Sequence, residues 1–170
     1  MKECYNINDI YQNQIFGVVS KNKIKRMEIV HKWGQWLRRS DSTWIKGTMS
    51  LQNLILDNEK KVVECVKQVN SDINEYEAEG FLAIIGIFEN KKIIELTNFE
   101  LKKMKMIILF LSSSDVLIME DLYEETSDDE KQELNQILIE FSVCKSILIT
   151  ASNIMAIQSI CDKIMDLDNG

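Results

Sequence analysis

Three short apolar runs interrupt an otherwise mixed pattern of hydrophobic and polar positions. They are Ile15–Val19, Val116–Met119 and Ser146–Thr150. Each run is rich in β-branched residues and does not alternate between apolar and polar positions. Strands buried on both faces of a parallel sheet have this pattern. We therefore predict three buried strands.

Helical patterns separate these runs, and two of them open with a capping box. The first box is Thr97-Asn98-Phe99-Glu100 and the second is Ser127-Asp128-Asp129-Glu130. Apolar residues follow both boxes at helical spacing, with Leu101, Met104, Ile108 and Leu111 after the first, and Leu134, Ile137, Leu138 and Phe141 after the second. A third apolar stripe comprises Ile154, Ile157, Ile160, Cys161 and Ile164. Strands that alternate with helices predict an α/β layered fold with a mostly parallel sheet.

The stretch between the first two predicted strands is less regular. TWIKGTMSL and KVVECVKQV are expected as edge strands that flank a turn. Residues 74–88 are expected to be helical, with Gly80 and Gly86 as weak points. The chain ends in Asn-Gly, a pair typical of a hairpin turn.

Length and composition are those of a globular protein. The 170 residues suit one compact domain, 45% are hydrophobic and 28% are charged. No apolar run approaches the length of a bilayer span, and the polar start lacks a signal-peptide core. The four cysteines show no paired spacing. We expect reduced, mostly buried cysteines in a cytoplasmic protein.

The net charge of −7 is unevenly distributed. Residues 21–46 hold eight Lys/Arg and two acids, whereas residues 115–140 hold ten acids and one Lys. The basic stretch also contains Trp33, Trp36 and Trp44, which makes nucleic-acid binding a third and least favoured hypothesis. The spacing of Trp33 and Trp36 favours packing on one helix face instead.

The order of these pieces resembles the nucleotide-binding domain of ABC transporters. Residues 81–170 carry the resemblance best, in FLAIIGIFENKKIIELTNFELKKMKMIILFLSSSDVLIMED and SILITASNIMAIQSICDKIMDLDNG. The match of INDIYQNQIFGVVSKNKIKRM to the first strand and phosphate loop is weaker. The resemblance implies one domain over 1–170 with a P-loop NTPase-like three-layer fold. Residues 69–110 or so would form a helical subdomain and signature-like helix, reduced because Gln68 and Leu96 are only 28 positions apart (96 − 68).

The phosphate-loop pattern G-x-x-x-x-G-K-[ST] falls on residues 20–27. Its glycines wrap backbone N–H groups around phosphates, its lysine reaches the outer phosphates and its hydroxyl holds magnesium. Ser20 and Lys25 replace the glycines, Arg26 the lysine and Met27 the hydroxyl. A thioether is a poor ligand for magnesium. Two interpretations remain for Lys23, Lys25 and Arg26, which share this stretch with Asn22. They either attract an anion at a helix start or belong to an ordinary solvated basic loop.

The strand-end acids have the family's charges in the reverse order. The resemblance gives an Asp that supports magnesium and then a Glu that polarises water, whereas this chain has Glu120-Asp121. The swap displaces each carboxylate by about 1 Å, which can cost ~100-fold in rate. A solvated acidic strand end is the alternative interpretation. The family's switch histidine corresponds to Ser152.

The signature motif LSGGQ corresponds to Leu96-Thr97-Asn98-Phe99-Glu100. Asn98 and Phe99 add bulk where the family has glycines, and Glu100 places a negative charge where the family faces a phosphate. VVECVKQ resembles the strand and glutamine with which the family senses magnesium and the membrane subunit. The resemblance assigns this sensing role to Gln68.

Phosphate loop, magnesium hydroxyl, signature and switch histidine thus all depart from the family at once. The first hypothesis is a degenerate, non-hydrolysing binding or regulatory subunit of a transporter complex, since little remains to lower the reaction barrier. Its partners would be an ATPase subunit (a second copy or an intact paralogue), a membrane permease, or both, and a permease would hold it at the inner face of the membrane. The alternative is an ATP-binding subunit that hydrolyses Mg-ATP for transport with a complementary partner. Neither hypothesis includes a bound metal of its own or a transmembrane segment.

Overall fold

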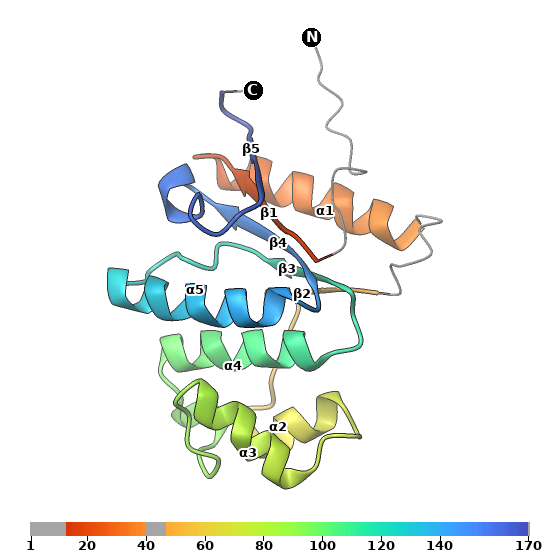
Figure 1. The fold of residues 1–170 in the computed structure, drawn as a ribbon, viewed down its shortest axis with the longest axis vertical. Coiled ribbons are helices and arrows are strands. Elements are labelled where there is room, and N and C mark those ends of the chain that lie inside the picture. Colours follow the sequence, from red (N-terminus) through yellow and green to blue (C-terminus); the bar gives the residue numbers. More distant parts are fainter. Residues whose placement is uncertain (1–12, 40–46, 170) are drawn as a thin grey trace. The chain divides into compact units, whose positions relative to one another are not determined.

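The computed structural model describes residues 13–39 and 47–169, which divide into two compact units. The sheet unit contains the described residues up to Ser50 and those from Ser114 onward, and the helical unit is Leu51–Ser113. Figure 1 colours the sheet unit red to orange and teal to blue, and the helical unit yellow to green. No helix in the described part of the chain is long and apolar enough to cross a membrane.

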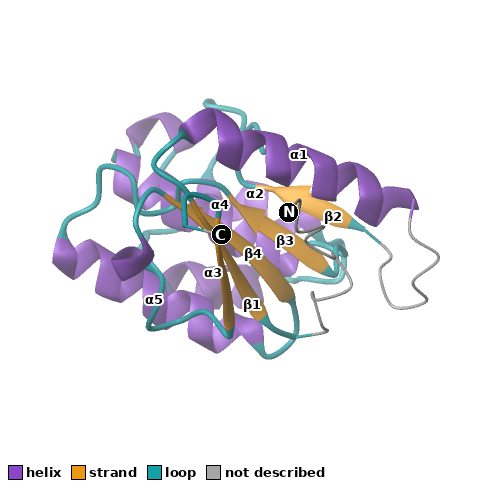
Figure 2. Ribbon diagram, turned by 90° about the horizontal axis from the view of Figure 1, so that it is seen from above, coloured by secondary structure: helices purple, strands orange, loops and turns teal. Residues whose placement is uncertain are grey.

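The sheet unit is built on five parallel strands in the order β2-β3-β4-β1-β5 (Figure 2). Their bounds are Ile15–Val19 for β1, Thr48–Ser50 for β2, Val116–Met119 for β3, Ser146–Ala151 for β4 and Lys163–Asp166 for β5. Every residue of β1, β3 and β4 is buried, as the runs without alternation predicted. The predicted α/β fold with a parallel sheet is therefore confirmed.

Two helices of this unit, α1 (Lys23–Arg39) and α5 (Asp128–Ser142), lie on opposite sides of the sheet (Figure 1). Trp33 of α1 packs edge-on against Phe16 of β1, with ring centroids 5.2 Å apart. Both belong to a buried cluster with Val18, Val30, Leu37, Val116, Ile118, Leu148 and Met165. Trp33 is therefore part of the core, and its ring is not available for base stacking. The side chain of Trp36 and the whole of Trp44 lie outside the described parts.

The helical unit contains α2 (Val62–Val69), α3 (Glu75–Ile84), a 3-10 turn η2 (Ile93–Glu95) and α4 (Asn98–Leu111). Helix α2 packs against α3 and α4. The capping boxes predicted at Thr97 and Ser127 are present and open α4 and α5. The helix predicted within 74–88 is α3, and Gly86 follows it with a φ of 68°.

Two predictions from the hydrophobic pattern were wrong. KVVECVKQV forms α2 rather than an edge strand, because Val62, Cys65 and Val66 recur at helical spacing and share its buried face. The stripe that starts at Ile154 forms only the 3-10 turn η3 (Ile154–Ala156), after which the chain turns back into β5. TWIKGTMSL does contain an edge strand, β2, in its described residues.

Candidate functional site

The connection between β1 and α1 has only three residues, Ser20, Lys21 and Asn22. In a phosphate loop the motif places about six residues between the strand and the lysine that opens the helix. Here Lys23 is already the first residue of α1, and Lys25, Arg26 and Met27 lie within its first turns. Residues 23–25, which the motif alignment places in the phosphate loop, are thus part of a regular helix.

Side chains of the connection bond the free N–H groups at the start of α1. The carboxamide oxygen of Asn22 accepts from the N–H groups of Ile24 and Lys25, at 2.9 and 3.4 Å. The hydroxyl of buried Ser20 accepts from the N–H of Asn22 at 3.0 Å. This is an N-cap arrangement, which satisfies donors that the helix itself leaves open.

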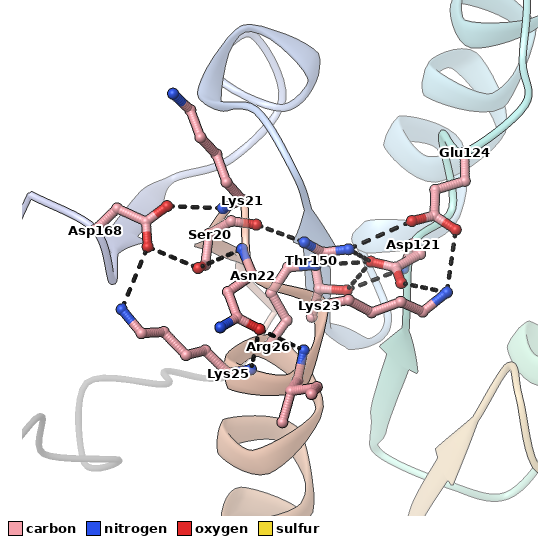
Figure 3. Close-up of polar contacts among 11 residues, drawn as sticks. Ser20, Lys21, Asn22, Lys23, Lys25, Arg26, Asp121, Glu124, Thr150 and Asp168 are labelled. Carbon is pink, nitrogen blue, oxygen red and sulfur yellow. Dashed lines mark hydrogen bonds and ion pairs between the residues drawn. The ribbon is translucent and has the colours of Figure 1, made fainter.

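Asp168 reaches the same connection from the end of β5 (Figure 3). Its carboxylate accepts from the Ser20 hydroxyl at 2.8 Å and from the Lys21 N–H at 2.7 Å. The Lys25 ammonium lies 3.5 Å from the same carboxylate. The Lys21 N–H, followed by the Ser20 hydroxyl, holds the pKa of Asp168 below its ordinary value.

Arg26 points into the sheet unit and is only 2% exposed (Figure 3). Its Nε donates to Asp121 Oδ1 at 2.9 Å, and its Nη2 lies 2.9 Å from the same oxygen and 3.3 Å from Glu124 Oε1. Its Nη1 donates to the backbone carbonyl of Ser20. Burial of a guanidinium is costly without such charged and hydrogen-bonded partners.

Lys23 contacts the same two acids as Arg26. Its Nζ lies 3.3 Å from Glu124 Oε2 and 3.4 Å from Asp121 Oδ2. The hydrogen bond and charge of Glu124, followed by the charge of Asp121, raise the pKa of Lys23. Two cations from α1 and two carboxylates after β3 therefore form one cluster, which we call the four-charge cluster (Lys23, Arg26, Asp121, Glu124).

Asp121 has a left-handed backbone, with a φ of 49°. Such a conformation is uncommon outside glycine, asparagine and aspartate. Thr150 of β4 supports it, because its Oγ1 accepts from the Asp121 N–H at 2.9 Å and lies 3.2 Å from Asp121 Oδ1. The parallel pairing of β3 with β4 brings these residues to the same edge of the sheet.

Glu120 and Asp121 have separate partners. Glu120 accepts from the hydroxyl of Ser50 at the end of β2, whereas Asp121 contacts α1. Among residues 13–39 and 47–169, no group of three His, Cys, Asp or Glu side chains lies together as a metal site.

Ser152 is exposed and lines a cavity of about 480 Å³ between the start of α5 and the β4–η3 connection. Polar side chains dominate this lining, including Tyr123, Gln132, Asn135, Asn153 and Ser159. The Tyr123 hydroxyl donates to Asn135, and burial raises the pKa of Tyr123. Ser152 is not a member of the four-charge cluster, although Glu124 lines the same cavity.

The signature-like residues all serve local structure in the helical unit. Thr97 accepts from the Glu100 N–H at 3.1 Å, and Glu100 accepts from the Thr97 N–H at 2.9 Å. Lys91 donates to Glu100 at 2.7 Å and holds the pKa of Glu100 below its ordinary value. The Phe99 ring lies 4.8 Å from the Lys103 ammonium. Leu96 ends η2, and Asn98 lines a smaller cavity of about 210 Å³.

Gln68 lies in the last turn of α2, where its carboxamide oxygen accepts from the Lys60 ammonium at 3.1 Å.

Of the residues that the sequence predicted for the site, the structure brings a subset together in the sheet unit: Ser20, Asn22, Lys23, Lys25, Arg26 and Asp121. Gln68 and the signature-like residues belong to the other unit.

The sequence analysis did not single out Glu124, Thr150 or Asp168. Glu124 and Asp168 lie in acidic stretches, but no spacing rule connects Asp168 to Ser20, 148 positions away. The signal that could have found them is the shared edge of parallel strands. Side chains at the end of β4 and just beyond β1, β3 and β5 meet at this edge.

Comparisons with protein-family models and with curated proteins find no match. Solved structures do match. An RNase-L inhibitor superposes with a TM-score of 0.72 at 18% identity over 92% of this chain, which spans 32% of that protein. CbiO1 from Clostridium perfringens, part of the ABC transporter complex cbiONQ, gives 0.72 at 16% identity over 92% of this chain and 74% of its own. An ABC transporter ATP-binding subunit gives 0.68 at 14% identity over 92% and 75%.

These likenesses define the class of fold. The chain has the α/β fold of ABC ATPase domains, with an all-parallel five-stranded sheet. It spans only about a third of the length of the RNase-L inhibitor that it matches.

Proposed function

We propose that the protein is a non-hydrolysing, ABC ATPase-like subunit that binds or regulates other components of a transporter complex. One observation carries the proposal. The cations and carboxylates that the fold would direct to Mg-ATP bind one another instead, in the four-charge cluster. Catalysis of phosphoryl transfer depends on positioning and electrostatic stabilisation, whereas the cations and carboxylates of this cluster are directed at one another.

The residues at the start of α1 do not fit Mg-ATP. The three-residue connection offers no loop to surround a triphosphate. The N–H groups of Lys21, Asn22 and Ile24 are bonded to Asp168, Ser20 and Asn22, respectively. Met27 stands where the family has a magnesium-binding hydroxyl, and a thioether does not ligate magnesium well. Each point supports a protein that keeps the fold without the ligand.

Partners are inferred from the fold and from an exposed surface. CbiO1 belongs to a transporter complex, and we extend that setting to this chain. The expected partners are a permease and an ATPase subunit, either a second copy of this chain or an intact paralogue, at the inner face of the membrane. The helical unit exposes five large apolar side chains that suit protein contact: Ile55, Tyr76, Ile84, Phe88 and Ile94.

Calorimetric titration of the purified protein with Mg-ATP tests the proposal. We expect no heat of binding up to millimolar nucleotide, and ATP turnover no faster than buffer. Asp121→Asn is the matched variant, because it removes the strand-end charge that hydrolysis would need. Magnesium-dependent binding by the wild-type protein, or turnover that Asp121→Asn abolishes, would exclude a non-hydrolysing subunit.

A second candidate is an ATP-binding subunit completed by a partner. Lys23 favours it, because this lysine opens α1 and its side chain is 53% exposed. In this case a complex purified from native cells would bind Mg-ATP, and Lys23→Ala in this chain would weaken that binding. Unchanged binding in Lys23→Ala would assign the nucleotide to the partner alone.

A further inference from the structure

The parallel pairing of β1 and β5 places the end of the described chain beside the start of α1. Val19 pairs with Asp166, and the Leu167 N–H donates to the Val19 carbonyl at 2.9 Å. Both strands therefore end at the same edge of the sheet. Asp168, two residues beyond β5, is delivered to the connection that follows β1 (Figure 3).

The Asp168 carboxylate makes the contacts of a bound anion. It accepts one side-chain and one backbone hydrogen bond, from Ser20 and Lys21, and a lysine ammonium lies 3.5 Å away. N–H groups and a positive charge at a helix start favour an anion at this place. The anion comes from the chain itself, 147 positions from Lys21.

We propose that Asp168 is a built-in anion that closes the start of α1 to phosphate, so that this segment inhibits anion binding in cis. The proposal rests on the proposed function, since it names what keeps phosphate out of the site. It is more than a capping contact, because capping by Asn22 already satisfies Ile24 and Lys25 without Asp168. Without the Asp168 carboxylate, Ser20, Lys21 and Lys25 would present two donors and a cation to an external anion.

The experiment is a titration of the 15N-labelled protein with inorganic phosphate at constant ionic strength, followed at the Lys21 amide. In the wild-type protein we expect only a small, non-saturating shift. In Asp168→Ala the shift should saturate, with an apparent Kd at least tenfold lower than in the wild type. Asp168→Asn keeps the shape without the charge, and it should also bind phosphate, more weakly than Asp168→Ala.

Asp129→Ala is the matched control, because it removes one exposed carboxylate from α5 and leaves the connection intact. A gain of phosphate binding in Asp168→Ala alone supports the proposal. Equal responses of the wild type and Asp168→Ala, or an equal gain in Asp129→Ala, overturn it. If Asp168→Ala does not fold, Asp168→Asn decides by the same criterion. Mg-ATP binding by the wild-type protein would instead overturn the proposed function, so the two failures are distinguishable.

Discussion

The Arg26 guanidinium and the Asp121 carboxylate meet at 2.9 Å, where the start of α1 faces the end of β3. The side chains of Arg26 and Asp121 are only 2% and 8% exposed. Each buried charge therefore depends on the other, instead of water, for its electrostatic stabilisation. A cation of the helix and an acid of the strand end thereby become structural partners. We therefore expect this pair to contribute to the free energy of unfolding of the protein.

Arg26→Ala should destabilise the protein by about 3–5 kcal/mol, because it leaves the Asp121 charge buried without its guanidinium. Arg26→Lys should lose less, since it keeps the charge but not the forked donor geometry. Urea unfolding measures both losses. Lys32→Ala, an exposed change on the same helix, should stay within about 0.5 kcal/mol of the wild type. Equal losses for Arg26→Ala and Lys32→Ala would contradict the buried pair.

Asp168→Asn should change how stability depends on pH. The pKa of Asp168 is lowered in the folded protein, so its carboxylate stabilises the fold above the ordinary aspartate pKa near 3.9. That contribution disappears as the pH falls through the still lower pKa of the folded state. The Lys25 ammonium faces the carboxylate, and Asp166 accepts from the Asp168 N–H.

Unfolding midpoints measured from pH 7 to about pH 3 check this expectation. The wild type should be more stable than Asp168→Asn at pH 7, and the two curves should converge at the acid end. Curves that stay parallel over the whole range would show that protonation of Asp168 is not coupled to folding.

Gly17→Ala should destabilise the sheet unit by about 1–3 kcal/mol through overpacking. A Cβ at Gly17 would lie 2.6 Å from Ile157 Cδ1 and 2.9 Å from Cys161 Sγ. Gly80→Ala is the opposite case. Gly80 is inside α3, and a Cβ added there would meet no neighbouring group within 4 Å. It should stabilise by about 0.4–1 kcal/mol. Thermal melts of both variants measure these changes in stability. An unchanged stability in Gly17→Ala would contradict the close packing of β1 against Ile157 and Cys161.

The rate of cysteine labelling should differ between Cys144 and Cys161. Cys144 is exposed, whereas burial, with a smaller contribution from Asp162, raises the pKa of Cys161 to about 12. Thiolate is the reactive form, so Cys161 should label far more slowly at pH 8. Because Cys4 lies outside the described residues, the measurement uses a Cys4→Ser background. Mass spectrometry of timed iodoacetamide reactions should find Cys144 modified before Cys161. Early modification of Cys161 would contradict its partial burial and raised pKa.

Thr97→Ala should destabilise the protein by about 0.5–2 kcal/mol, because it removes the side-chain cap of α4. Thr97→Ser keeps the hydroxyl and should recover most of that loss. Circular dichroism during urea unfolding provides the measurement. If both variants lost the same stability, the capping box would not be what Thr97 contributes.

Local patterns predicted much of the fold. The strand prediction was right at Ile15–Val19 and Val116–Met119, because continuous burial on both faces leaves runs without polar positions. The starts of α4 and α5 were right because a capping box is a local interaction, complete within four residues. Short apolar runs are ambiguous, and this is why the residues of α2 were interpreted as a strand.

The candidate site was only partly predictable from the sequence. Alignment to a motif assigned roles to residues 20–27 but did not predict that the helix begins at Lys23. The contacts of Asp168 with Ser20 and Lys21 join opposite ends of the chain. They depend on the register of β5 beside β1, and no local spacing records that register.

The three-residue link between β1 and α1 limits what side-chain substitution can change. Exchanging side chains, even Arg26 and Met27 for lysine and threonine, alters chemistry without adding backbone. A longer loop at this place would require inserted residues between β1 and α1. Under the proposed function, libraries made by base substitution alone should therefore yield no nucleotide turnover.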